Sequence, residues 1–131
     1  MNSKDYTFCF ESIIAWQKAH AFVLLVYQIT KLFPDEERFG LTSQFRRAAV
    51  SIEANIAEGY KKVGRQDKLQ FMNIAQGSLE ECRDYIILSR DLNYINRDQI
   101  HLLYDSITEA SKLLNAYCNG IINNRALEQK I

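Results

Sequence analysis

The stretch RDQIHLLYDSITEASKLLNAYCNGIIN, residues 97–123, decides the fold. Its apolar side chains recur at intervals of three and four, a spacing that puts them on one face of an α-helix. These side chains are Ile100, Leu103, Ile107, Ala110, Leu114, Tyr117 and Ile121. A heptad of this kind is typical of helices that pack against other helices. Because Asn96 is a suitable N-terminal cap, the sequence predicts a helix over residues 97–123 with one buried face.

Three earlier segments, at about residues 12–33, 41–62 and 66–93, show the same helical periodicity. The predicted buried stripe of the first is Trp16, Ala19, Val23, Val26, Thr30 and Phe33, widened by Ile13, His20 and Tyr27. The stripe of the second is Leu41, Phe45, Ala48, Ile52, Ile56 and Gly59. That of the third is Phe71, Ala75, Ser78, Cys82, Tyr85, Ser89 and Leu92, flanked by Met72, Leu79, Ile86 and Leu88. The wide apolar arcs of the first and third segments indicate more than one neighbour for each.

Short connections separate the four predicted helices. Pro34, the single proline, ends the first helix because proline is unfavourable inside a helix and disfavours helical geometry at the residue before it. A charged connection at residues 35–40 follows, and Thr42 or Ser43 is the expected cap of the second helix. Gly77, inside the third helix, costs about 1 kcal/mol relative to Ala, which is tolerable if a partner side chain or backbone packs there. Short connections join antiparallel neighbours, and the predicted fold is therefore all-α, an antiparallel up-down-up-down four-helix bundle.

The composition agrees with a single helical domain over residues 1–131. The chain is 47% hydrophobic and 24% charged, which is ordinary for a globular protein. Its five glycines and one proline are too few for a β-sandwich or barrel, which needs turn residues about every ten positions. The formal net charge is zero, whereas dedicated nucleic-acid binders are usually basic. We expect the polar tail, residues 125–131, to fray.

The cysteines and the apolar runs indicate the compartment. Cys9, Cys82 and Cys118 are odd in number and widely spaced, which argues against a disulfide framework or a zinc site. Residues 1–10 lack the basic and then apolar pattern of a signal peptide. The longest apolar stretch, residues 21–27, is too short to span a bilayer. We therefore predict a cytoplasmic protein without a membrane partner.

The residue spacings do not indicate catalysis. His20 and His101 fall on different predicted helices, and the Glu-x-x-His motif of di-iron bundles does not occur. Adjacent carboxylates on a helix, such as Glu80 and Glu81, point about 100° apart and do not converge on one substrate. Gly-rich phosphate loops, GxSxG elbows and HExxH motifs are also missing from the sequence. The sequence predicts no enzyme, no metal and no cofactor, and favours a function in binding.

Two polar features are candidate sites. The first is Asn55, Glu58 and Glu81, which we interpret as a polar network either within one subunit or between subunits. An enzyme site between helices at these residues is a remote alternative. The second is the basic set Arg46, Arg47, Lys61, Lys62, Arg65 and Lys68. Its first two members lie at the opposite end of the second helix from the rest. Only an assembly of subunits could join them into one nucleic-acid surface, and an ordinary solvated face is the alternative.

Several motifs resemble a family of bacterial four-helix bundle proteins. They are FGLTSQ at residues 39–44, RRAA at 46–49, SI at 51–52, NIAEG at 55–59 and IAQGSLEE at 74–81, together with Trp16, Ala19, Val26, Tyr27, Thr30, Phe33, Pro34 and the LNY at 92–94. The family is known from intervening sequences in 23S ribosomal RNA genes and carries the label S23 ribosomal protein. The resemblance covers nearly the whole chain. Glu53 and Ala54 depart from the family pattern, which has small or proline residues there.

The resemblance implies a bundle that assembles into a ring, typically a homopentamer, without known enzymatic activity. A related branch, the accessory variability proteins of diversity-generating retroelements, forms basic pentameric barrels that bind a reverse transcriptase and nucleic acid. This chain is neutral and differs from that branch in charge. The resulting hypothesis is a non-enzymatic, homo-oligomeric binding scaffold, with a reverse transcriptase, RNA or DNA as implied further partners. Direct nucleic-acid binding by a basic surface assembled across subunits is the alternative.

Overall fold

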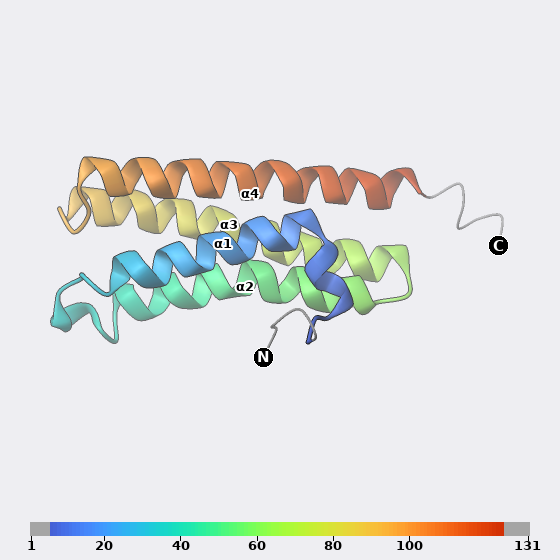
Figure 1. Cartoon of the computed structure of the whole chain (residues 1–131), viewed down its shortest axis with the longest axis horizontal. Coiled ribbons are helices and arrows are strands. Elements are labelled where there is room, and N and C mark those ends of the chain that lie inside the picture. Colours follow the sequence, from blue (N-terminus) through green and yellow to red (C-terminus); the bar gives the residue numbers. More distant parts are fainter. Residues whose placement is uncertain (1–5, 125–131) are drawn as a thin grey trace.

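The computed structural model of the chain describes residues 6–124, and these residues form an all-helical bundle. Its elements are η2 (Cys9–Ser12), α1 (Ile14–Thr30), η3 (Asp35–Glu37), α2 (Leu41–Lys61), α3 (Arg65–Asp91) and α4 (Arg97–Asn123). The four α-helices run side by side in alternating directions, and no strand occurs within residues 6–124 (Figure 1). α1 packs against α2 and α4, and α3 packs against the same two helices. The predicted four-helix bundle is confirmed, while the predicted fraying of residues 125–131 lies outside the described residues.

All four helices contribute to one core between them. On α2 the whole predicted face is buried, from Leu41 to Gly59. On α4 the predicted residues Leu103, Ile107, Ala110, Leu114 and Ile121 are buried. Cys118 is buried in place of Tyr117, because a straight helix of 3.6 residues per turn drifts away from a seven-residue repeat. The heptad of α4 therefore predicts its core face correctly except at Tyr117 and Ile100, which are half-buried.

The predicted stripe of α1 is buried at Ala19, Val23, Val26 and Thr30 but is too narrow, whereas the buried face of α3 is rotated relative to its predicted stripe. Phe22 and Ile29 of α1 are buried although the predicted stripe omits them. On α3 the predicted flanks Met72, Leu79 and Ile86 are all buried. The apolar arcs of both helices are wide, so a single stripe does not locate the centre of the buried face.

Local hydrogen bonds determine where α1 ends and where α4 begins. α1 ends at Thr30, earlier than predicted, because the N–H groups of Leu32 and Phe33 donate to carbonyls three residues back. Bonds of that length tighten the chain into a turn instead of continuing the α-helix. α4 begins as predicted: Asn96 Oδ1 accepts from the Gln99 N–H at 2.9 Å, and Gln99 Oε1 accepts from the Asn96 N–H at 2.8 Å. This reciprocal pair satisfies two N–H groups that the helix leaves without partners.

A residue outside the helix caps α2. The expected caps Thr42 and Ser43 are wrong, because the helix already begins at Leu41. Glu37 Oε1 accepts from the Leu41 N–H at 3.1 Å, and Glu37 Oε2 accepts from the Tyr94 hydroxyl at 2.8 Å. The backbone N–H of Leu41, followed by the Tyr94 hydroxyl, lowers the pKa of the Glu37 carboxyl. Glu37 thereby ties the α1–α2 connection to the α3–α4 connection at one end of the bundle.

Two helical glycines have opposite surroundings. At Gly59 an added Cβ would lie 2.8 Å from Phe71 Cβ and would also clash with the methyl group of Met72. A side chain at Gly59 would therefore push α2 away from α3. At Gly77 an added Cβ would meet no atom of the described residues within 4 Å. Gly77 is exposed, so packing within the described chain does not offset its cost in the helix.

Candidate functional site

Asn55 takes part in a polar network that joins α2 to α3 within one chain. Asn55 Nδ2 donates to the Ser51 carbonyl at 2.7 Å and to Ser51 Oγ at 3.0 Å. Ser78 Oγ on α3 donates to Ser51 Oγ at 2.8 Å. All three residues are half-buried, where an unpaired polar group would cost stability. The network therefore gives Asn55 a structural role inside the bundle.

Glu58 and Glu81 have surroundings different from those of Asn55. Glu81 Oε2 accepts from the Tyr85 hydroxyl one turn along α3, at 2.7 Å. This hydrogen bond, with burial, raises the pKa of Tyr85 to about 12. Glu58 is exposed on α2 and makes no hydrogen bond or ion pair with another residue of the 6–124 range. The three predicted residues thus do not share one polar network.

Arg46 connects α2 to the end of α1. Its Nε donates to Thr30 Oγ1 at 2.8 Å, and its Nη2 donates to the Tyr27 carbonyl at 3.4 Å. The guanidinium also lies 4.6 Å from the centre of the Tyr27 ring. A cation at a helix C-terminus compensates the last carbonyls and the helix dipole. These contacts assign half-buried Arg46 to the stability of the bundle.

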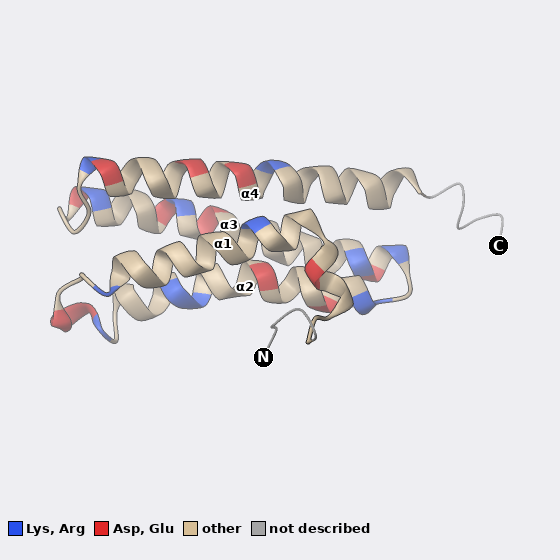
Figure 2. Cartoon of the chain, in the orientation of Figure 1, with Lys and Arg blue, Asp and Glu red and all other residues tan. Residues whose placement is uncertain are grey.

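The other predicted basic residues form two groups. Arg47 is exposed near the start of α2, and its Nη2 donates to Gln44 Oε1 at 2.5 Å. The second group gathers at the α2–α3 connection, visible as blue ribbon at the right of Figure 2. It consists of Lys61, Lys62, Arg65 and Lys68. Most of the length of α2 separates Arg47 from Lys61, which is about 20 Å at the rise of an α-helix. One chain therefore presents one four-residue basic cluster and not a six-residue surface.

His20 pairs with Glu53, one of the two residues that depart from the family pattern. The His20 ring stacks on Trp16 with centroids 4.7 Å apart, and His20 Nδ1 lies 3.0 Å from Glu53 Oε2. His101 is exposed on α4, with Asp105 one turn later. Within residues 6–124 no group of three or more His, Cys, Asp or Glu side chains is arranged to hold a metal ion.

The cysteines of the bundle interior are poor nucleophiles. Cys82 and Cys118 are buried free thiols, and Cys9 is exposed. Burial raises the pKa of Cys82 to about 12 and also raises the pKa of Cys118. Because the thiolate is the reactive form, a raised pKa suppresses reaction at neutral pH. Both residues therefore act as small apolar core groups.

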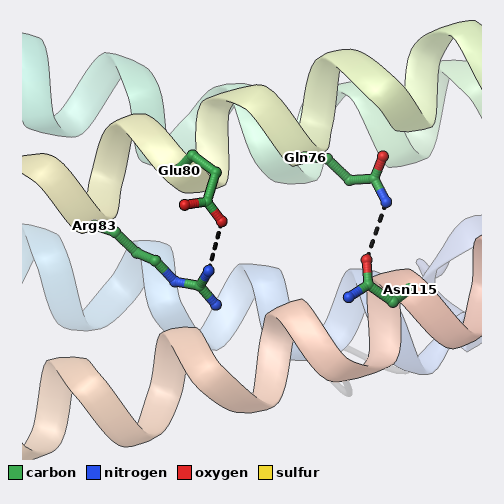
Figure 3. Close-up of polar contacts among 4 residues, drawn as sticks. All are labelled: Gln76, Glu80, Arg83 and Asn115. Carbon is green, nitrogen blue, oxygen red and sulfur yellow. Dashed lines mark hydrogen bonds and ion pairs between the residues drawn. The ribbon is translucent and has the colours of Figure 1, made fainter.

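A furrow runs along the outer side of α3 and α4, and one end of it is lined by carboxamides. This end has a volume of about 650 Å³ and is lined by Leu69, Gln70, Asn73, Gln76, Asn115, Cys118, Asn119 and Ile122. Gln76 Nε2 donates to Asn115 Oδ1 across the furrow at 3.0 Å. Closer to the middle, Glu80 accepts from Arg83 on the same helix (Figure 3). The lining of this end is uncharged.

The other end of the furrow is apolar and lies between two arginines. It measures about 300 Å³ and is lined by Arg83, Ile86, Ile87, Arg90, Ile100, Tyr104 and Ile107. Ile87 is 47% exposed and Tyr104 is 63% exposed, so the apolar lining is open to solvent. An apolar hollow with a few charged groups at its rim is suited to receiving part of a partner. Sequence reasoning missed this surface, because the exposure of Ile87 and Tyr104 is evident only once the buried positions are located.

The outward face of α1 is a second apolar surface. Ile14 and Leu24 are each 57% exposed, and Ala21 and Gln28 are exposed between and beyond them. No Asp, Glu, Lys or Arg occurs from residue 19 to residue 30. Figure 2 shows α1 almost entirely tan, while α3 carries both colours. A helix that is apolar nearly all round is normally covered on every side.

Comparison with known proteins identifies the family. The family model of the 23S rRNA-intervening sequence protein matches residues 11–116. The chain belongs to this family. A similar solved structure is a protein with unknown function from the S23 ribosomal protein family of Bacteroides thetaiotaomicron VPI-5482. It is 28% identical, with a TM-score of 0.73 over 79% of this chain and 97% of that chain. A search of curated proteins gave no match.

Membership of this family confirms the resemblance found in the sequence. The matched residues 11–116 include α1, α2 and α3 and most of α4. Among the helices formed by residues 6–124, none is long and apolar enough to cross a membrane. The solved relative is described as having unknown function, so the family relation supplies the fold and no activity.

Proposed function

We propose that this chain is a non-enzymatic, cytoplasmic subunit of a homo-oligomer that serves as a binding scaffold. The proposal rests on one observation: apolar side chains are exposed on α1 and in the α3–α4 furrow. Extended apolar patches on a soluble protein mark surfaces that bind a partner. A head-to-tail contact between copies covers two different surfaces on each and closes as a ring when its rotation closes. The family resemblance implies five copies.

Binding is favoured over catalysis by the engagement of the polar residues. Asn55, Arg46 and Glu81 each make hydrogen bonds to neighbours in the same chain. A catalytic site would need polar groups that converge on a pocket and keep capacity for a substrate. The carboxamide end of the furrow contains no carboxylate, lysine or histidine. Its chemistry suits hydrogen bonding to a partner better than proton transfer.

Light scattering coupled to size-exclusion chromatography tests the scaffold at micromolar concentrations. We expect a single species whose mass is a multiple of the 15.2 kDa of one chain, five-fold for a pentamer. The species should persist on dilution through the micromolar range, because an obligate interface is largely apolar. A strictly monomeric mass at every concentration would falsify the scaffold.

The basic cluster at the α2–α3 connection supports nucleic-acid binding as a second candidate. Lys68 Nζ donates to the Tyr60 carbonyl at 2.6 Å, and Lys62 Nζ lies 5.1 Å from the centre of the Phe71 ring. The intervening Val63 is 97% exposed, and Lys61 and Lys62 beside it are exposed as well. In a ring with the helices along the axis, every subunit would add one such cluster to the same rim. A reverse transcriptase partner stays a prediction of the resemblance.

Salt dependence tests the nucleic-acid candidate. We expect RNA and DNA oligonucleotides to bind with an affinity that falls steeply as salt rises, because binding releases counterions from the phosphates. The double variant Lys61→Glu, Lys62→Glu should abolish binding, and Lys112→Glu on exposed α4 is the matched control. Lack of binding by the wild type at low ionic strength would remove this candidate and leave the scaffold untouched.

A further inference from the structure

The two apolar surfaces lie at the same level of the bundle. Lys18 Nζ of α1 lies 3.1 Å from Glu109 Oε1 of α4, which fixes the two antiparallel helices beside each other. Thr30, the end of α1, is as many residues away from Lys18 as Arg97, the start of α4, is from Glu109. These two antiparallel stretches therefore have the same length. Leu24, half-way along that stretch of α1, is therefore level with Leu103.

The level of Leu24 is also the level of the apolar end of the furrow. Leu103 lies between Ile100 and Ile107 on α4, and both of these line the arginine-flanked hollow. The carboxamide end is lined by residues nearer the α4 C-terminus, from Asn115 to Ile122, and so lies beyond the N-terminal end of α1. Only the apolar end of the furrow thus matches the outward face of α1 in height.

We propose that the outward face of α1 in one copy docks into the arginine-flanked end of the α3–α4 furrow in a second copy. This inference rests on the proposed homo-oligomer and names its interface. Rotation about an axis parallel to the helices moves each subunit sideways without raising or lowering it. Both halves of a ring contact must then lie at one level, and Leu24 and the hollow satisfy that condition. Surfaces at different levels would instead build an open helical filament.

The chemistry of the two surfaces is complementary. The centre of the α1 face is Ala21, Leu24 and Gln28, a small, a large and an amide side chain, without a charge that would oppose Arg83 or Arg90. Leu24 fits a hollow of isoleucines, in the manner of a helix laid into an apolar groove. The Gln28 side chain lies toward the end of the bundle that carries Arg90, and its carbonyl oxygen can accept a hydrogen bond from a guanidinium. A neutral or acidic face can therefore bind between Arg83 and Arg90, whereas a basic face would be repelled by these two arginines.

The arginines are available for a new partner. Arg83 bonds to Glu80, and Arg90 Nε bonds to Asp91 at 2.9 Å, with all four side chains substantially exposed. Exposed ion pairs contribute little, about 0–1 kcal/mol, because water screens them. Exchanging these partners for acceptors on a neighbouring α1 therefore costs little.

Disulfide trapping between two separately made proteins tests the contact. One carries Leu24→Cys and the other Ile87→Cys, each on a Cys9→Ser background because Cys9 is the exposed native thiol. A disulfide needs Cβ atoms within about 4.5 Å of each other. Unfolded together in urea, refolded as a mixture and then mildly oxidised, the two proteins should form a disulfide-linked pair. Leu24→Cys mixed with Val63→Cys, which lies on the α2–α3 connection, should form none.

Each alternative result of the trapping experiment has one meaning. Linking of Leu24→Cys to itself would mean that two α1 helices face each other, and would overturn docking in the furrow. An oligomer by light scattering without the mixed pair would overturn the interface and leave the scaffold standing. A monomeric wild type would overturn both proposals together.

Charge substitutions at Leu24 give an independent readout. We expect Leu24→Arg to weaken assembly at least about tenfold more than Leu24→Glu, because only arginine meets the like charges of Arg83 and Arg90. Ile74→Arg, an exposed site on α3 outside the furrow lining, should leave the mass unchanged. Circular dichroism confirms that each variant is folded. Equal effects of arginine and glutamate at Leu24 would place α1 against a surface other than the furrow.

Discussion

α1 and α3 hold equivalent places in the bundle, each between α2 and α4, yet their outward faces differ in kind. α1 carries Lys18 and His20 but no acidic residue, and its exposed side chains include Ile14 and Leu24. The charged residues of α3 are Arg65, Asp67, Lys68, Glu80, Glu81, Arg83, Asp84, Arg90 and Asp91. Most of the outer face of α3 thus resembles that of a helix in contact with water, and α1 has the surface of a helix with a further neighbour. Packing within one chain explains the inner faces of both helices, but it leaves Leu24 of α1 and Ile87 of α3 exposed.

The largest expected effect is the difference in unfolding free energy between substitutions on the two faces of α1. Phe22 is fully buried, so Phe22→Ala should lower the free energy of unfolding by about 3–5 kcal/mol through lost contacts and a cavity. Leu24 is exposed, so Leu24→Ala should change the unfolding free energy of the isolated subunit by no more than about 0.5 kcal/mol. Urea denaturation of each variant measures both values. A large loss for Leu24→Ala at concentrations where the chain is monomeric would contradict the division of α1 into two faces.

A smaller effect tests how closely α3 packs on α2. Gly59→Ala should destabilise the chain by about 1–3 kcal/mol, because the new methyl group meets Phe71 Cβ and Met72. Gly120→Ala on α4 is the matched control, since its Cβ would meet no atom within 4 Å among the described residues. Thermal melts followed by circular dichroism give the comparison. If both variants were equally stable, α2 and α3 would have to be able to move apart without cost.

The outward face of α3 offers a gain in stability. Gly77→Ala should raise the free energy of unfolding by about 1 kcal/mol, because alanine is the better helix former and the site is open. We expect the oligomer mass to be unchanged, since the water-facing side of α3 needs no close approach. A variant that is more stable as a monomer but fails to assemble would show that a second copy packs on Gly77.

The smallest effect concerns the connections that follow α1 and α3. The pKa of Glu37 is lowered from 4.5 in the folded chain, so its contribution to stability is present above that pH. The contribution is lost as pH falls from 4.5 through the folded pKa, where the carboxylate takes up a proton. Tyr94→Phe removes the second of the two hydrogen bonds to Glu37 and should flatten this acid dependence. Urea midpoints at pH 7 and at pH 3 measure it, and an identical pH difference in both proteins would contradict the assignment.

The sequence predicted the bundle because its pattern is local. The heptad from Ile100 to Leu114, the cap Asn96 and the break at Pro34 each report on a few neighbouring residues, and the structure follows them. The cap of α2 could not be predicted, since Glu37 reaches Leu41 only when the Tyr94 connection holds it. The additional burial of Phe22 and Ile29 beside the predicted stripe of α1 depends likewise on where the neighbouring helices lie.

The candidate site was less predictable than the fold. Sequence reasoning selected charged and amide residues, and the structure assigns Arg46 and Asn55 to contacts within the chain. In the sequence, Leu24 and Tyr104 cannot be distinguished from ordinary helix residues until the core positions are known. Their exposure becomes informative only when the buried positions have been located.

The hydrogen bond from Tyr94 to Glu37 makes the three connections of the chain unequal for protein engineering. Two of them are fastened together at one end of the bundle, so an insertion in either would pull on α2 and α4 at the same time. The third contains Val63, whose side chain is 97% exposed. A fluorescent domain or an affinity tag inserted beside Val63 would leave the helix register undisturbed. It would also project away from the α1 face, and so would mark each subunit without blocking its neighbour.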